Sequence, residues 1–350
     1  MHDSEQIKHY RTAITRITRR AMMVGAVLVG SVCGCGGDVD SPETPEVEQS
    51  RSVSLRIVTY NAHLLPGAAA GVAGERGAAK YRAGAIAEQL VEYDLIGICE
   101  AFDRVHSQTL IDAFQAGDPD RFQVAKGPKR SGRRLVGGGL LLLSRYPIEE
   151  SHTTTYKHSS RFLTSGFKAD GFAAKGALHA RIRIGDDPHA VIDCFLTHLE
   201  SRSKRARARQ IKQLAEFIEL HSTPQYPIVV MGDFNVAADA PNAVEQNGNK
   251  TPYQRLRAAM AHNDRQLIDV GSMFPKSRGG TSDALAEDGG GRIDYVFVSD
   301  PQATDASRLE PKEARTLPLL DDKVPEGSLS DHLGVACRIE FLWPVATSRE

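Results

Sequence analysis

The 350-residue sequence contains little cysteine, a single tryptophan and almost no net charge. Five cysteines, two of them within the first 35 residues, are too few for a disulfide-rich scaffold. The chain has 43 basic and 44 acidic side chains; five basic and two acidic ones lie in residues 1–35, which leaves 38 and 42 in the rest. A mildly acidic body argues against broad neutralisation of nucleic-acid phosphates, although it allows an enzyme with a local basic patch.

A long hydrophobic stretch is also missing from most of the chain. The only long uncharged apolar run, residues 21–34, follows Arg16, Arg19 and Arg20. A membrane-spanning helix needs about 20 apolar residues, so this run is too short to cross a bilayer comfortably. A positively charged flank, a short apolar stretch and then small residues predict a secretory signal within residues 1–35.

The end of this segment, residues 32–35, reads Val-Cys-Gly-Cys and resembles a bacterial lipobox. An aliphatic residue at −3 and a glycine at −1 precede Cys35, which implies that Cys35 is lipidated; Cys33 fits the pattern less well. We therefore expect an exported cell-envelope lipoprotein, held at the outer membrane or the cell surface. A twin-arginine signal around residues 18–20, a secreted product and an uncleaved membrane anchor are the alternatives.

Residues 36–52 differ from the rest of the chain in composition. The segment is acidic, contains two prolines and has no apolar periodicity. It cannot bury enough apolar surface to offset the loss of chain entropy, so we expect a flexible tether. The folded part is then predicted to be one domain spanning residues 53–343, and we expect a monomer.

Short apolar runs rich in β-branched residues recur along this domain, at residues 55–58, 95–99, 139–143, 191–196, 228–231, 293–298 and 334–341. Several are continuous rather than alternating, as expected of strands covered on both faces. Apolar side chains with helical spacing predict helices near residues 80–93 and 207–220. Cys99, Cys194 and Cys337 each fall in a strand-like run, so we expect free core thiols rather than a disulfide. These patterns favour two packed sheets with helices outside, in the α/β or α+β class.

Polar residues able to bind metal ions or transfer protons lie at the ends of six of these runs. Strand ends and the adjoining loops are where a rigid scaffold can hold functional groups. Each residue also has a simple structural alternative, since an asparagine can cap a turn and a lone histidine is more often a hydrogen-bonded core residue. It is the ordered set that points to chemistry: Asn61, His63, Glu100, His198, Asp233, Asn235, Asp294, Asp331 and His332.

In this order, the motifs around these residues resemble the endonuclease/exonuclease/phosphatase superfamily of metal-dependent phosphodiesterases and phosphatases. The matching motifs are Thr59-Tyr60-Asn61, Ile98-Cys99-Glu100, Thr197-His198-Leu199, Gly232-Asp233-Phe234-Asn235, Arg292-Ile293-Asp294-Tyr295 and Ser330-Asp331-His332. The resemblance covers roughly residues 53–341 and implies a four-layered α/β sandwich of two packed mixed sheets flanked by helices. The segments at residues 61–66, 99–103 and 170–177 are similar to the sphingomyelinase branch, above all Lys175-Gly176, which nuclease branches generally lack.

The resemblance implies a divalent cation, Mg²⁺ with Mn²⁺ or Ca²⁺ as alternatives. Glu100 would supply the main carboxylate, and Asn61 and Asp331 would complete or orient the metal site; few protein oxygens are what Mg²⁺ requires. His332 is the best candidate for the general base because imidazole titrates near neutral pH. Asp294 would hold that imidazole in the correct tautomer.

Four further residues acquire roles by the same resemblance. Asp233 and Asn235 would position the nucleophile and the phosphate, and His198 would donate a hydrogen bond to the phosphate or the leaving oxygen. Lys175 would place an additional positive charge near the phosphate, with a surface salt bridge as the alternative.

Two clusters of basic residues, at 126–134 and 202–209, keep a second interpretation open. They are either solvated faces or the rim of a cleft that attracts an anionic membrane or polynucleotide. The sequence therefore predicts a sphingomyelinase-type hydrolase of a phospholipid diester, brought to the membrane by its lipid anchor. A surface nuclease acting on nucleic acid is the alternative, and a non-catalytic lipoprotein is a third.

Overall fold

The computed structural model describes residues 50–65, 78–130, 132, 134–160, 172–238, 250–261, 265–277, 279–300 and 307–344. The predicted signal segment and lipidation site Cys35 lie outside these residues and stay predictions. Strand β1 (Ser50–Leu64) begins three residues before the predicted domain start at residue 53. Ser50, Arg51 and Ser52 pair with the end of strand β12 (Gly334–Pro344). The amino-acid composition does not indicate this pairing, because the strands pair through backbone groups and the three side chains remain exposed.

The first of two six-stranded sheets has β1 near its centre. Its order is β11 (Arg308–Leu317), β12, β1, β2 (Leu95–Ala101), β4 (Leu141–Ser144) and β3 (Gln123–Lys126). Strands β1 and β2 run parallel and the other neighbours are antiparallel. The sheet is therefore mixed.

The second sheet has the order β5 (Ile148–Thr155), β6 (Gly176–Arg183), β7 (Val191–His198), β8 (Ile228–Asp233), β10 (Asp294–Ser299) and β9 (Ile268–Asp269). Only β7 and β8 run parallel. Side chains from both sheets, including Leu55 and Ile57 of β1 and Leu196 and Met231 of the second sheet, form one buried cluster. The two sheets thus pack face to face.

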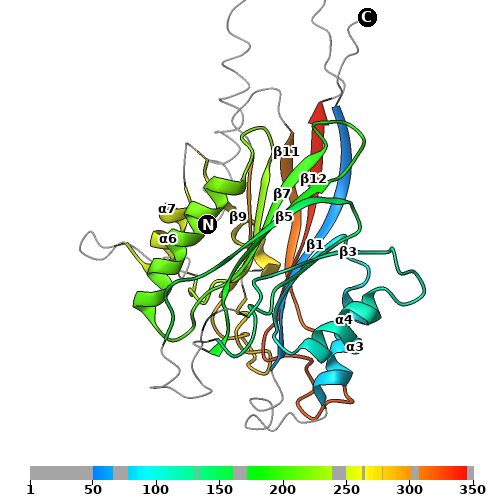
Figure 1. The fold of residues 1–350 in the computed structure, drawn as a ribbon, viewed down its shortest axis with the longest axis vertical. Helices are drawn as coiled ribbons and strands as arrows, with labels where there is room; N and C mark the ends of the chain where they lie inside the picture. Colours follow the sequence, from blue (N-terminus) through cyan, green and yellow to red (C-terminus); the bar gives the residue numbers. More distant parts are fainter. Residues whose placement is uncertain are drawn as a thin grey trace, which may run out of the picture. The chain divides into compact units, whose positions relative to one another are not determined.

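Helices cover the outer face of each sheet (Figure 1). Helices α3 (Ala78–Leu90) and α4 (Arg104–Phe114) share a core with the first sheet, and α6 (Lys204–His221) and α7 (Pro252–Met260) share one with the second. A short α8 (Val270–Met273) and a 3₁₀ turn, η3 (Pro275–Ser277), precede β10. The four-layered α/β sandwich is confirmed. Among the described residues, no helix has both the length and the apolarity to cross a membrane.

Burial on both faces explains the continuous apolar runs. Along β1, Leu55 and Ile57 face the core between the sheets, whereas Val58 and Tyr60 face the helices. Because successive side chains of a strand point to opposite faces, a strand between two cores needs apolar residues at nearly every position. Cys99, Cys194 and Cys337 lie in the core between the sheets as free, buried thiols, as predicted.

A buried ion pair supports the start of β10. Arg292 donates to both oxygens of Asp269, at 3.0 and 2.7 Å, and the Asp269 side chain is fully buried. Tyr253 also donates to this carboxylate. We expect Asp269→Ala to lower the free energy of unfolding by about 3–5 kcal/mol, because it leaves a buried guanidinium without its partner. Urea denaturation measures this, with Glu310→Ala in an exposed pair as the control, for which about 1 kcal/mol or less is expected. Equal losses would contradict the role of the buried pair.

Candidate functional site

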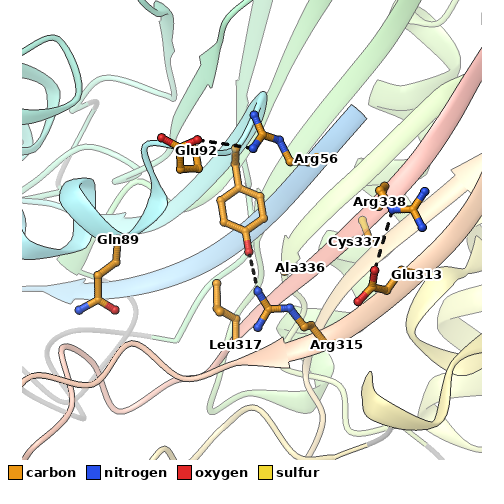
Figure 2. Close-up of a pocket in the computed structure, with 10 residues that line it drawn as sticks. Arg56, Gln89, Glu92, Glu313, Arg315, Leu317, Ala336, Cys337 and Arg338 are labelled. Atoms are coloured by element: carbon orange, nitrogen blue, oxygen red, sulfur yellow. Dashed lines mark hydrogen bonds and ion pairs between the residues drawn. The ribbon is translucent and has the colours of Figure 1, made fainter. Parts of the chain in front are cut away.

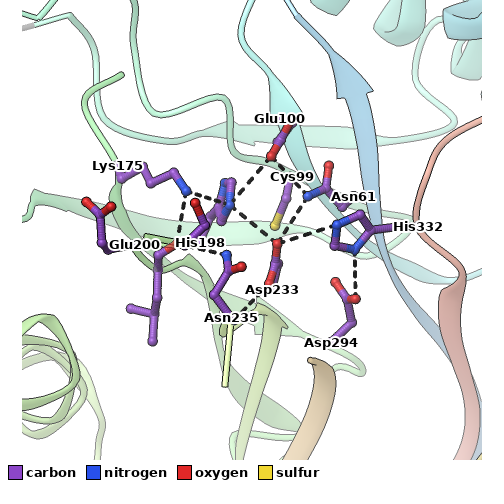
Figure 3. A network of polar contacts seen from close by, with 12 residues as sticks. Asn61, Cys99, Glu100, Lys175, His198, Glu200, Asp233, Asn235, Asp294 and His332 are labelled. Atoms are coloured by element: carbon purple, nitrogen blue, oxygen red, sulfur yellow. Dashed lines mark hydrogen bonds and ion pairs between the residues drawn. The ribbon is translucent and has the colours of Figure 1, made fainter. Parts of the chain in front are cut away.

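The predicted site residues converge at one end of the two sheets (Figure 3). Asn61 Nδ2 lies 3.2 Å from both Glu100 Oε1 and Asp233 Oδ2. His198 Nε2 lies 3.6 Å from Glu100 Oε1 and 3.4 Å from Asp233 Oδ2. His332 Nε2 lies 4.0 Å from the same Asp233 oxygen. Residues from both sheets therefore share a single polar cluster, as the ordered motifs predicted.

Strand register places these side chains. In the second sheet Asp233 pairs with His198 on one side and with Asp294 on the other. Gly232, directly before Asp233, has φ +134°, and a Cβ there would lie 2.0 Å from the carbonyl oxygen of Thr197. Only glycine permits this close approach of β7 and β8. The glycine of the Gly-Asp-Phe-Asn motif therefore has a structural function.

His332 and Asp294 form a buried pair. His332 Nδ1 lies 2.9 Å from Asp294 Oδ2. Burial lowers the pKa of His332, but the carboxylates of Asp294, Asp233 and Asp331 raise it more, so the net shift is upward. Ser330 accepts from the backbone of His332 at 3.2 Å and donates to the Asn61 carbonyl at 2.7 Å, which ties this loop to β1. With Nδ1–H donated to Asp294, Nε2 faces the cluster as the basic nitrogen.

Lys175 is part of the cluster rather than of the surface. Its side chain is buried, and Nζ lies 2.8 Å from His198 Nε2 and 3.0 Å from the Leu199 carbonyl oxygen. An ammonium group can only donate hydrogen bonds, so His198 Nε2 is the acceptor at this contact. The surface salt bridge considered for Lys175 is therefore wrong. In this structure Lys175 donates to His198. Donation by His198 to the phosphate or the leaving oxygen stays a prediction.

Gly176 explains how Lys175 reaches this position. A Cβ on Gly176 would lie 1.9 Å from the Thr154 carbonyl oxygen, so β5 and β6 can pair here only around a glycine. Strand β6 begins at this residue. The Lys175-Gly176 pair thus joins a charged group to the backbone feature that positions it.

Asn235 and Asp331 lie at the edge of the cluster. Asn235 donates through its backbone to Asp233 Oδ1 at 2.8 Å and through Nδ2 to the Leu199 carbonyl at 3.0 Å. Asp331 Oδ1 lies 2.9 Å from His63 Nδ1, and its side chain is 55% exposed. The metal-ligand role predicted for Asp331 stays a prediction, while its observed partner is His63.

Two residues near the site received no role from the sequence. His63 Nδ1 lies 3.9 Å from Glu100 Oε2, so it links Glu100 to Asp331. The buried Arg82 of α3 donates to the carbonyls of His63, at 2.8 Å, and Leu329, at 3.0 Å. The sequence placed His63 in the ordered set without a role, whereas an arginine in an alanine-rich helix carries no signal of a functional site.

Backbone strain is concentrated at the site. Among the described residues other than glycine, only His63, Glu100 and Asn235 have positive φ, at 48°, 61° and 51°. This left-handed region is unfavourable for residues with a side chain. Such strain gathers at functional sites, where the surrounding structure holds it in place.

The donor set fits a hard divalent cation. Glu100, His198 and Asp233 each offer a ligand atom within 4.8 Å of the others, and so do Asp233, Asp294 and His332. Burial and the nearby charge of Asp294 raise the pKa of Asp233. Buried neighbouring carboxylates favour an added positive charge, and oxygen-rich donors suit Mg²⁺. The metal-ligand roles predicted for Glu100 and Asn61 stay predictions; Asn61 Oδ1 accepts from the backbone N–H of His63 at 3.1 Å.

A hollow of about 400 Å³ lies elsewhere on the first sheet (Figure 2). Its arginines already have partners: Arg56 lies 3.6 Å from Glu92, and Arg338 lies 3.9 Å from Glu313. None of the predicted site residues lines this hollow. We therefore assign the chemistry to the polar cluster.

Replacing Lys175 tests its place in the cluster. We expect Lys175→Met to lower kcat/KM for a phosphodiester by about 10²–10³-fold, the cost of removing one preorganised donor near a developing charge. Steady-state kinetics measures this, with the exposed Lys157→Met as control and circular dichroism to verify folding. Kinetics equal to those of the control would assign Lys175 a purely structural role.

Comparison with known proteins agrees with this geometry. The sequence profile of the endonuclease/exonuclease/phosphatase family matches residues 58–332. Sphingomyelinase C 2 of Leptospira interrogans is 26% identical over 219 residues, which cover 57% of this chain. The chain spans only 33% of the length of that relative.

Two solved structures share the fold. Sphingomyelinase C of Streptomyces griseocarneus superposes with a TM-score of 0.57 at 20% identity, over 82% of this chain and 99% of the other. A Staphylococcus aureus beta toxin variant with bound magnesium ions superposes with a TM-score of 0.56 at 17% identity, over 81% and 99%.

Proposed function

Because the chain belongs to the endonuclease/exonuclease/phosphatase family, we propose that it is a divalent-cation-dependent phosphodiesterase that hydrolyses a phospholipid of the sphingomyelin type. The observation that carries this proposal is the buried His332–Asp294 pair facing Asp233, Glu100 and Asn61 in one cluster. The lipid substrate is supported by the Lys175-Gly176 pair and by the name of the Leptospira relative.

The chain's own residues account for the movement of protons. Asp294 accepts the Nδ1–H of His332, so the Nε2 lone pair takes a proton from the attacking water. The oxygen of that water forms a bond to phosphorus while the bond from phosphorus to the leaving oxygen breaks. The leaving oxygen takes a proton from solvent, and His332 Nε2 returns its proton to solvent, so the products are a phosphomonoester and an alcohol. Asp233, 4.0 Å from His332 Nε2, lies where it can orient the water.

Positive charge is needed where the phosphate oxygens gain negative charge. A divalent cation bound by Glu100 and Asn61 would stabilise that charge as a Lewis acid. Lys175 adds a fixed positive charge beside His198 at 2.8 Å. Burial of Lys175 strengthens its effect because the surrounding dielectric is low.

Incubation of the purified protein with sphingomyelin vesicles and Mg²⁺ tests the proposal. We expect release of phosphocholine that is abolished by EDTA and by His332→Ala. No release beside an active sphingomyelinase control would exclude the lipid substrate. EDTA-sensitive nicking of plasmid DNA without lipid hydrolysis would favour the nuclease alternative.

A further inference from the structure

Three histidines with no role in the proposed reaction meet on the outer face of the second sheet. His152 of β5 pairs directly across the strands with His179 of β6, and His221 is the last residue of α6, which covers this face (Figure 1). The ring centroids of His152 and His221 are 4.2 Å apart, and each is 5.7 Å from that of His179. One ring nitrogen of each lies within 4.8 Å of those of the other two.

A buried carboxylate sets the tautomer of His179. His179 Nε2 lies 2.9 Å from Asp193 Oδ1, and both side chains are fully buried. Asp193 also accepts from Arg181 at 2.9 and 3.2 Å and from the backbone of Thr223 at 2.7 Å. Burial raises the pKa of Asp193, but these hydrogen bonds lower it more, so the carboxylate is ionised at neutral pH. Nε2 of His179 therefore carries the proton.

The other ring nitrogen of His179, Nδ1, is then unprotonated and carries a buried lone pair. Nδ1 has no hydrogen-bond partner among the described residues. Buried polar atoms are rarely left in this state, so the atom calls for an explanation. A carboxylate that accepts from one nitrogen of a histidine while the other remains basic is the usual support of a metal-binding histidine.

The position of His221 in its helix also favours a bound cation. His221 lies at the carboxyl end of α6, where the helix dipole favours positive charge.

We propose that His152, His179 and His221 bind a borderline divalent cation, Zn²⁺ in the first instance, separate from the oxygen-rich catalytic cluster. Imidazole nitrogens select Zn²⁺, Cu²⁺ or Ni²⁺, whereas carboxylate and amide oxygens suit Mg²⁺. Zn–N bonds of about 2.0–2.1 Å require the three nitrogens to approach one another further. His179 is held by Asp193, whereas His152 is 43% exposed, so we expect the His152 side chain to be the one that moves when the ion binds.

The bound ion would act as a clamp. Strand β5 is an edge strand, and edge strands are the less protected parts of a sheet. An ion shared by β5, β6 and the end of α6 would hold this edge against the helix that covers it. The expected consequence is higher thermal stability with Zn²⁺.

Zinc stoichiometry in the EDTA-treated full chain tests the site. Equilibrium dialysis against Zn²⁺ followed by elemental analysis is applied to the wild type, Glu100→Gln, the double variant His152→Ala/His221→Ala, and the exposed control His189→Ala. We expect the double variant to lose one equivalent of Zn²⁺ and the associated rise in Tm. Glu100→Gln and His189→Ala should keep this equivalent of Zn²⁺ and the rise in Tm.

A single variant separates loss of the site from loss of the fold. His152→Ala removes a partly exposed side chain, and we expect it to weaken Zn²⁺ binding by at least about 100-fold with an unchanged circular dichroism spectrum. A double variant that binds as much Zn²⁺ as the wild type, or a wild type whose Tm does not respond to Zn²⁺, would overturn the proposal.

Discussion

Asp294→Asn is expected to lower kcat by about 10⁴-fold while leaving the fold and cation binding intact. The amide keeps the size of the carboxylate but no longer fixes the Nδ1–H tautomer of His332, to which Asp294 is bonded at 2.9 Å. Nε2 would then spend much of its time protonated or turned away from the water. Steady-state kinetics on the phosphodiester substrate measures this loss.

The pH profile separates this explanation from general damage. Asp294 raises the pKa of His332, so its removal should lower that pKa. A general base acts only when deprotonated, hence the acid limb of kcat/KM should move to lower pH in Asp294→Asn. The exposed Asp112→Asn serves as the control. Unchanged turnover, or an acid limb that does not move, would refute the pairing.

The second large effect is expected for Glu100→Gln. Glutamine keeps the shape of the side chain and can still accept from Asn61 Nδ2, which lies 3.2 Å from Glu100 Oε1. It removes the negative charge that would hold the cation, so we expect Mg²⁺ affinity to fall by at least about 100-fold and activity with it.

Calorimetric titration with Mg²⁺ measures that loss directly, and activity at increasing Mg²⁺ shows whether excess cation restores turnover. Glu88→Gln on the exposed face of α3 is the matched control. Unchanged Mg²⁺ affinity in Glu100→Gln would contradict the ligand assignment. It would indicate that the cation binds at the other acidic pair, Asp233 and Asp294.

Much of the fold could be predicted from the sequence because its signals are local. The runs at residues 55–58 and 228–231 became β1 and β8. Helix α6 was expected at residues 207–220 and spans Lys204–His221. It begins earlier because Ser203 caps it by accepting from the backbone of Ala206, an interaction that apolar periodicity does not report. Helix α3 differs from its prediction at the other terminus, because it ends at Leu90, three residues before the predicted end.

The site was found through motifs, but its internal contacts were not. Glu100 and His332 were expected to meet, and they do share a cluster with Asp233. The burial of Lys175 and the link from Asp331 to His63 could not be anticipated, because each depends on loops that return from distant parts of the chain. Arg82 is the clearest example, since it supports the site from a helix whose sequence favours packing alone.

The sequence by itself predicted seven of the twelve described strands and the helices α3 and α6, placed Cys99, Cys194 and Cys337 in the core, and identified side chains that could perform phosphodiester chemistry. Only the tertiary structure decided that Lys175 is buried, that His63 contacts Asp331, and that His152, His179 and His221 meet on one face. The physical reason is that secondary structure follows from the periodicity of neighbouring residues. Contacts between distant polar groups instead depend on strand register and sheet packing, which are set by the burial of the whole core.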